Sequence, residues 1–81
     1  MIKMFEIKVE EIFTLKDKGQ IIVGIANDYH YIGKLRCGSL IVESIGYDIF
    51  PVRFDGKISL LIKDFLLNSD FIGKTFYQVV E

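Results

Sequence analysis

A two-residue alternation that slips once is the feature of this sequence that most limits its fold. Segment 5–9 alternates apolar with charged residues, which places the apolar side chains on one face of an extended strand. At Glu10-Glu11 the alternation shifts by one residue, and it then resumes through Leu15. One extra residue in an alternating strand indicates a β-bulge. The pattern therefore predicts a long strand that bends around a small barrel.

The rest of the chain is divided into short extended segments by turn residues. Its seven glycines are spread at intervals that suit short strands joined by tight turns. No window holds a sustained 3.6-residue period, so at most one short helical turn is expected, near 63–69. Further strands are predicted over 20–26, 40–45, 47–54, 58–62 and 75–80, with turns at 16–19, 55–56 and 72–74, a loop at 27–33 and a short irregular segment at 34–39.

The length of the chain decides how these strands must be arranged. Six or seven short strands in 81 residues cannot bury both faces of an open sheet. Closing the sheet on itself removes the exposed edges and encloses one core. We therefore expect an all-β protein with a single domain over residues 1–81, folded as a small closed six-stranded Greek-key β-barrel.

Composition excludes several classes of protein. With half its residues hydrophobic the chain is not intrinsically disordered, and no apolar run approaches the roughly 20 residues of a membrane-spanning helix. The first residues lack the apolar core of a signal peptide, so a cytoplasmic location is expected. A net charge of −1 disfavours strong non-specific binding to nucleic acid. One cysteine and one histidine exclude an internal disulfide and a cysteine-based zinc site, so no metal or cofactor is expected.

The loop over 27–33 holds the clearest candidate for a binding site. Tyr29, His30 and Tyr31 stand together on a polar loop, and tyrosine is enriched at protein interfaces. Lys34 and Arg36 follow closely and complete the predicted partner-binding set. The competing interpretation is that one of the tyrosines folds back over the barrel mouth. His30 has no second histidine or obvious partner in the sequence, so no catalytic residue is predicted.

Other side chains support weaker interpretations. Cys37 is predicted to be a buried apolar residue rather than a nucleophile, because no activating base is evident. Glu6, Glu10 and Glu11 form either a solubilising face or an acidic docking strip. A basic patch for RNA competes with an ordinary solvated surface for one set of cations: Lys34, Arg36, Lys57, Lys63 and Lys74.

Several segments also match the pattern of a known family in the same order. The stretch Phe5-x-Ile7-x-Val9-Glu10-Glu11-Ile12-Phe13-x-Leu15 is similar to an opening strand in which an acidic pair precedes an apolar residue and phenylalanine. Segment 18–24 is close to "G-x-V-V-x-G", and Gly33-x-Leu35-x-x-Gly38-Ser39-x-Ile41 is close to "G-x-[IL]-x-x-G-[DE]-x-[VI]". Segments 58–63 and 71–76 match the last two strands. Together these segments resemble domain 2 of the translational GTPases, the elongation factor Tu family.

The resemblance implies a fold more than an activity. In that family the domain is a closed six-stranded barrel that packs on the GTPase domain and helps to hold the aminoacyl end of tRNA. This chain has no P-loop, so no nucleotide site or GTPase activity carries over. It also departs from the family pattern in its longer aromatic loop between Gly24 and Gly33, and in Asp64, where the family often has glycine.

Two functions follow as expectations. The first is a non-catalytic stand-alone module that binds another protein, of the adaptor or immunity type, because the chain combines a barrel and an aromatic loop with no catalytic constellation. The alternative is a β-barrel associated with RNA or the ribosome, following the family's setting. An enzyme is the least favoured, because a closed barrel of this size fills its interior with side chains.

Overall fold

The residues that the structure describes form six strands and one short helical turn. The computed structural model describes residues 4–28, 31–47 and 57–80. The strands are β1 (Glu6–Leu15), β2 (Gly19–Ala26), β3 (Gly33–Cys37), β4 (Leu40–Tyr47), β5 (Lys57–Ile62) and β6 (Thr75–Gln78), and the 3₁₀ turn η1 spans Ser69–Phe71. No helix within these residues is long and apolar enough to cross a membrane.

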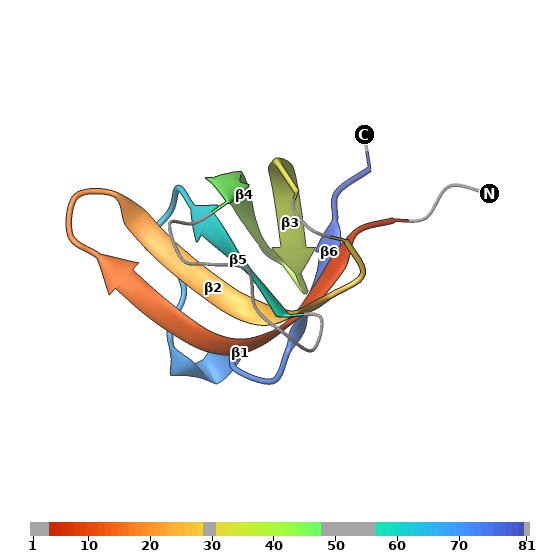
Figure 1. The fold of residues 1–81 in the computed structure, drawn as a ribbon, viewed down its shortest axis with the longest axis horizontal. Coiled ribbons are helices and arrows are strands. Elements are labelled where there is room, and N and C mark those ends of the chain that lie inside the picture. Colours follow the sequence, from red (N-terminus) through yellow and green to blue (C-terminus); the bar gives the residue numbers. More distant parts are fainter. Residues whose placement is uncertain (1–3, 29–30, 48–56, 81) are drawn as a thin grey trace.

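The strands close into one antiparallel barrel in the order β1-β2-β5-β4-β3-β6. Strands β3, β4 and β5 are consecutive neighbours, and β6 returns by a longer connection to lie beside β3, as Figure 1 shows. Three consecutive strands with a fourth beside the first are a Greek key. The predicted fold class, a closed six-stranded Greek-key barrel, is therefore confirmed.

The predicted bulge lies where the alternation slips. Val9 pairs with Gly24 and Glu11 pairs with Val23, so two residues of β1 advance while β2 advances by one and Glu10 has no partner of its own. A bulge increases the local bend and twist of a strand. Here it turns the far half of β1 away from β6, and the β1–β2 hairpin extends beyond the other strands (Figure 1).

The core is built from inward-facing residues of all six strands and from two residues outside them, Phe5 and Leu67. Alternating positions of β1 are buried before the bulge, as a two-residue period requires. Phe76 of β6 is fully buried and its ring lies 5.8 Å from that of Phe71. The buried cluster consists of Phe5, Ile7, Val9, Ile22, Leu35, Val42, Leu60, Ile62, Leu67 and Phe76.

One end of the barrel is closed by the segment that follows β5. Leu67 is buried there, and its backbone is held by the buried side chain of Gln20. The Gln20 amide nitrogen donates to the Leu67 carbonyl at 2.8 Å, and its amide oxygen accepts from the Leu67 N–H at 2.9 Å. Asn68 then accepts a hydrogen bond from the Asp70 N–H and begins η1. The one short helical turn in the described residues therefore spans Ser69–Phe71, at the end of the region predicted near 63–69.

The boundaries of other elements differ from the sequence-based expectation. Segment 34–39 was predicted to be irregular, which is wrong, because β3 covers most of it. β4 continues two residues beyond the predicted 40–45, and β6 ends at Gln78. The remainder of the predicted strand over 47–54 and the predicted hairpin turn at 55–56 lie outside the described residues.

Candidate functional site

Two predicted binding residues lie on the outside of the barrel wall. Lys34 and Arg36 are exposed, and Leu35 between them is fully buried, because successive side chains of β3 point to opposite faces. Arg36 forms no salt bridge or side-chain hydrogen bond with any residue that the structure describes. Its guanidinium is therefore available to a carboxylate from outside the chain.

The strand order sets an apolar side chain on each side of Arg36. Arg36 pairs with Ile41 of β4 and with Tyr77 of β6. Side chains directly opposite on antiparallel strands are about 5 Å apart at Cβ and share one face. Ile41 is 49% exposed and Tyr77 is 47% exposed, so a row of isoleucine, arginine and tyrosine crosses three strands on the surface.

Further apolar surface continues this row along β4. Ile45 is exposed four residues beyond Ile41 on the same strand, and Ile32 is exposed just before β3. Between Ile41 and Ile45 on β4, Glu43 stands opposite Lys34 of β3. The Glu43 carboxylate lies 3.8 Å from the Lys63 ammonium. We call the set Lys34, Arg36, Ile41, Ile45 and Tyr77 the β3 outer face.

Tyr31 has a structural position rather than a free one. Its ring stacks on Phe5 with centroids 4.8 Å apart and an interplanar angle of 9°. Its hydroxyl donates to the Lys34 carbonyl at 2.9 Å, and its own carbonyl accepts from the Ser44 hydroxyl at 2.6 Å. Tyr31 thus folds back onto the barrel, the alternative interpretation of this loop. Tyr29 and His30, the other two residues of the predicted set, lie outside the described residues.

The packing of Tyr31 leads to a stability prediction. Replacing Tyr31 with alanine removes the stack on Phe5 and the hydroxyl bond to Lys34, and we expect the free energy of unfolding to fall by about 2 kcal/mol. Tyr31→Phe keeps the ring and should cost about 1 kcal/mol. Urea denaturation followed by circular dichroism measures both values. Equal stability of Tyr31→Ala and the wild type would contradict this packing role.

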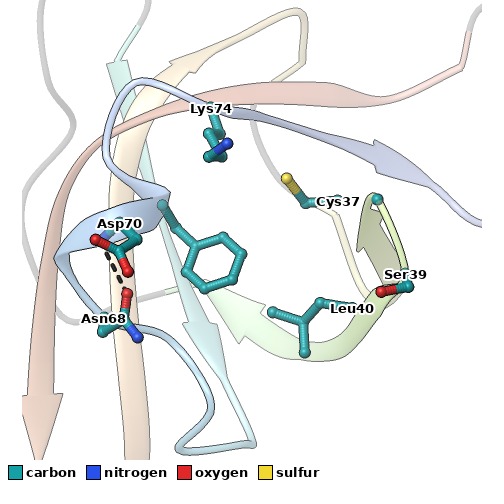
Figure 2. Close-up of a pocket in the computed structure, with 8 residues that line it drawn as sticks. Cys37, Ser39, Leu40, Asn68, Asp70 and Lys74 are labelled. Carbon is teal, nitrogen blue, oxygen red and sulfur yellow. Dashed lines mark hydrogen bonds between the residues drawn. The ribbon is translucent and has the colours of Figure 1, made fainter.

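An open groove of about 530 Å³ lies at the end of the barrel, between the β3–β4 turn and η1. Figure 2 shows Leu40 and Cys37 on one side of it, with Asn68 and Asp70 on the other and Lys74 above. The groove is lined by Cys37, Gly38, Ser39, Leu40, Asn68, Asp70, Phe71 and Lys74. It thus combines apolar walls with one carboxylate and one ammonium.

The groove does not bring together a recognisable catalytic set. Cys37 is half-buried and packs against the core cluster, close to the buried position that was predicted for it. None of the described residues that line the groove is a histidine, so none of them supplies an imidazole to activate the thiol. Among the described residues, no group of three or more His, Cys, Asp and Glu side chains could hold a metal ion.

The structure distributes the predicted basic set over several parts of the barrel. Lys57 forms a 2.9 Å salt bridge with Glu10, and Lys63 lies near Glu43. Lys74 lines the groove instead. These cations are therefore interspersed with acids, which does not favour a continuous path for a phosphate backbone.

Asp64, a departure from the family pattern, has a local structural explanation. Its carboxylate accepts a hydrogen bond from the Glu43 N–H at 3.0 Å, while the Lys63 N–H donates to the Glu43 carbonyl at 2.9 Å. Both bonds join the end of β5 to β4 close to the bulge between Ser44 and Gly46. A glycine at this position would leave the Glu43 N–H without its carboxylate partner.

Sequence reasoning missed the apolar half of the β3 outer face. Ile41 and Tyr77 are ordinary strand residues. Only their positions in the two-residue alternation of each strand could have indicated that they face outward. Comparison of the chain with protein-family models, curated proteins and solved structures finds no match. The strand pairing by itself shows a closed six-stranded antiparallel β-barrel. The β3 outer face is the candidate site that the geometry of this barrel supports best.

Proposed function

We propose that this barrel is a non-catalytic module that binds another protein through the β3 outer face, as a small adaptor or immunity-type protein would. The observation that carries the proposal is the row in which Arg36 stands between the exposed Ile41 and Tyr77. Tyrosine and arginine are enriched among residues that dominate binding energy at protein interfaces. Three neighbouring, hydrogen-bonded strands hold these residues in place, which reduces the entropy lost on binding.

The charge of this face favours a partner of particular chemistry. Arg36 offers a planar guanidinium that can bind a carboxylate through two hydrogen bonds, and Lys34 adds a second positive charge beside it. The flanking isoleucine and tyrosine side chains would exclude water from such a contact. The partner is therefore expected to present an exposed aspartate or glutamate bordered by apolar side chains.

RNA is the alternative partner, as the resemblance to translational GTPase domain 2 suggests. Two carboxylates interrupt the positive charge near Arg36, since Glu43 stands opposite Lys34 and Glu6 stands opposite Tyr77. A run of phosphates would have to pass both carboxylates, whereas a single carboxylate of a protein partner needs only Arg36, so a protein is favoured. Filter binding to tRNA at low salt distinguishes the two partners. Tight binding that weakens steeply with salt and is lost in Arg36→Glu would support RNA instead.

The test begins by trapping the partner at the predicted surface. A photoreactive benzophenone amino acid replaces Tyr77, and in a matched variant it replaces Ile25, an exposed residue of β2, the strand opposite β3 in the closed strand order. After irradiation in the native cell, a partner cross-linked at position 77 and not at position 25 is expected. Equal cross-linking at both positions, or none at position 77, contradicts the proposal.

The affinity of the trapped partner is then measured with purified proteins. Arg36→Glu reverses the charge at the centre of the row and should weaken binding about tenfold or more by isothermal titration calorimetry. Lys18→Glu makes the same change in net charge at the β1–β2 turn and should leave the affinity unchanged. If both variants weaken binding equally, net charge rather than the β3 outer face controls recognition.

A further inference from the structure

The row of outward side chains that contains Arg36 extends onto a fourth strand. Tyr77 of β6 pairs with Arg36 of β3 on one side and with Glu6 of β1 on the other. Figure 1 shows β3, β6 and the start of β1 side by side. Glu6 is exposed, so its side chain shares the outer face of the barrel with Tyr77. We call Ile41, Arg36, Tyr77 and Glu6 the four-strand row.

The row carries two opposite charges that the described part of the chain does not neutralise. Neither the Glu6 carboxylate nor the Arg36 guanidinium forms a salt bridge or a side-chain hydrogen bond with any residue in the described ranges. The two side chains stand on opposite sides of Tyr77. A partner that offers a carboxylate to Arg36 and a cation to Glu6 would therefore complement both charges.

The distance between these charges matches the repeat of an α-helix. Neighbouring strands are about 4.8 Å apart, so the backbones at Arg36 and Glu6 are separated by about 9.6 Å across the barrel wall. Residues seven positions apart on an α-helix share one face and are separated by about 10.5 Å. Same-face residues of an extended strand are separated by about 6.8 or 13.6 Å, which fits less well. A helix that crosses the strands along the row therefore reaches both charges.

The surroundings of the row favour a helix over the face of another sheet. Lys34 stands two residues from Arg36 on one side of the row, and Lys8 stands two residues from Glu6 on the other side. Both are charged and exposed. A flat sheet face would cover these lysines together with the row and would remove them from water. A helix is only about 10 Å wide, so a helix on the row leaves both lysines at a solvated rim.

We propose that the partner binds the four-strand row through an α-helix that carries an acidic and a basic residue seven positions apart on one face. This inference rests on the proposed function and adds to it the shape and the charge pattern of the partner. The acidic residue binds Arg36 and the basic residue binds Glu6. A small residue between them packs on Tyr77, and an apolar residue one turn beyond the acidic one contacts Ile41.

Two synthetic helical peptides of identical composition test the spacing. Both carry a leucine, a glutamate four residues later and an alanine four residues after that, and both are stapled by a lactam. In the first peptide a lysine follows the glutamate by seven residues. In the second it follows by nine, which places it on the opposite face of the helix. Titrated into isotope-labelled protein and followed by NMR, the first should shift the amide signals of Glu6, Arg36 and Tyr77 and bind about threefold more tightly than the second.

Charge reversal identifies the residue that recognises the lysine of the first peptide. Glu6→Lys replaces an attraction by a repulsion and should weaken binding of this peptide about tenfold. It should also make the protein prefer a third peptide, in which glutamate replaces that lysine. Glu11→Lys is the matched control, because it makes the same change in net charge at an exposed position of β1 beyond the bulge and should leave the affinity unchanged. Equal affinity of the first two peptides, or equal effects of the two variants, would overturn the inference.

A measurement on the natural partner separates this inference from the proposed function. Cross-linking at position 77 tests whether a protein binds the β3 outer face at all. Mass spectrometry of the cross-linked segment then tests the helix, since an acidic and a basic residue seven positions apart are expected in that segment. A partner trapped specifically at position 77 through a segment without this pair would overturn the helix and leave the proposed function standing.

Discussion

Replacing Gly24 with alanine is expected to destabilise the barrel by about 3 kcal/mol or more. A Cβ at Gly24 would overlap with the carbonyl oxygen of Lys8 and would lie 3.1 Å from Cγ1 of Ile7. Both atoms belong to β1, which is hydrogen-bonded to β2 at this point and cannot move away cheaply. Guanidinium denaturation followed by circular dichroism measures the loss.

Gly38 provides the matched control for this prediction. A Cβ there would meet no atom within 4 Å, and its φ of +63° lies in the left-handed region that asparagine tolerates. Gly38→Asn should therefore cost about 1 kcal/mol or less. If Gly24→Ala proved as stable as Gly38→Asn, close approach of the two strands would not be the reason for glycine at position 24.

Replacing Gln20 with leucine is expected to cost about 3 kcal/mol, because it removes two buried partners at once. The Leu67 N–H and C=O bond only to the Gln20 side chain in the described structure, and leucine would leave both buried and unsatisfied. The loss should be accompanied by faster hydrogen exchange at the Leu67 amide, as the closing segment detaches from the barrel.

Thr14→Val is the matched control, because it removes another hydrogen bond of Gln20 and leaves the two bonds between Gln20 and Leu67 in place. Gln20 also donates to the Thr14 hydroxyl at 3.1 Å, and valine removes that acceptor while keeping the shape of the side chain. The two bonds to Leu67 remain, so a cost below about 1 kcal/mol is expected. If Gln20→Leu were as stable as Thr14→Val, the two hydrogen bonds between Gln20 and Leu67 would not be what holds the segment after β5 on the barrel.

Most of the strands could be predicted because their information is local. The alternation in β1 and the β-forming run of β2 each occupy one continuous stretch, and the extra residue at Glu10 marks the bulge directly. β3 was missed because only one fully buried residue, Leu35, stands between two charged ones. Five residues with that pattern form a strand only because β4 and β6 pair with them on either side.

The candidate site was predicted only in part, for a related reason. Lys34 and Arg36 were included in the predicted partner-binding set because they follow the aromatic loop closely. Tyr31 was included as a binding residue because tyrosine is common at interfaces, yet the same ring that binds a partner can also pack on its own barrel. Its stack on Phe5 joins residues 26 positions apart, which no local pattern reveals.

By itself the amino-acid sequence determined the extended conformation of most strands, the position of the bulge and the side of β1 that turns from water, since all three depend on neighbours along the chain. Only the tertiary structure decided that Tyr77 lies beside Arg36, and Arg36 beside Ile41. Strand order arises from closing the sheet around a shared core, where every inward side chain competes for the same volume. The same two-residue alternation along each strand is compatible with any order of strands in the sheet. Which outward side chains become neighbours is therefore decided only when the barrel closes.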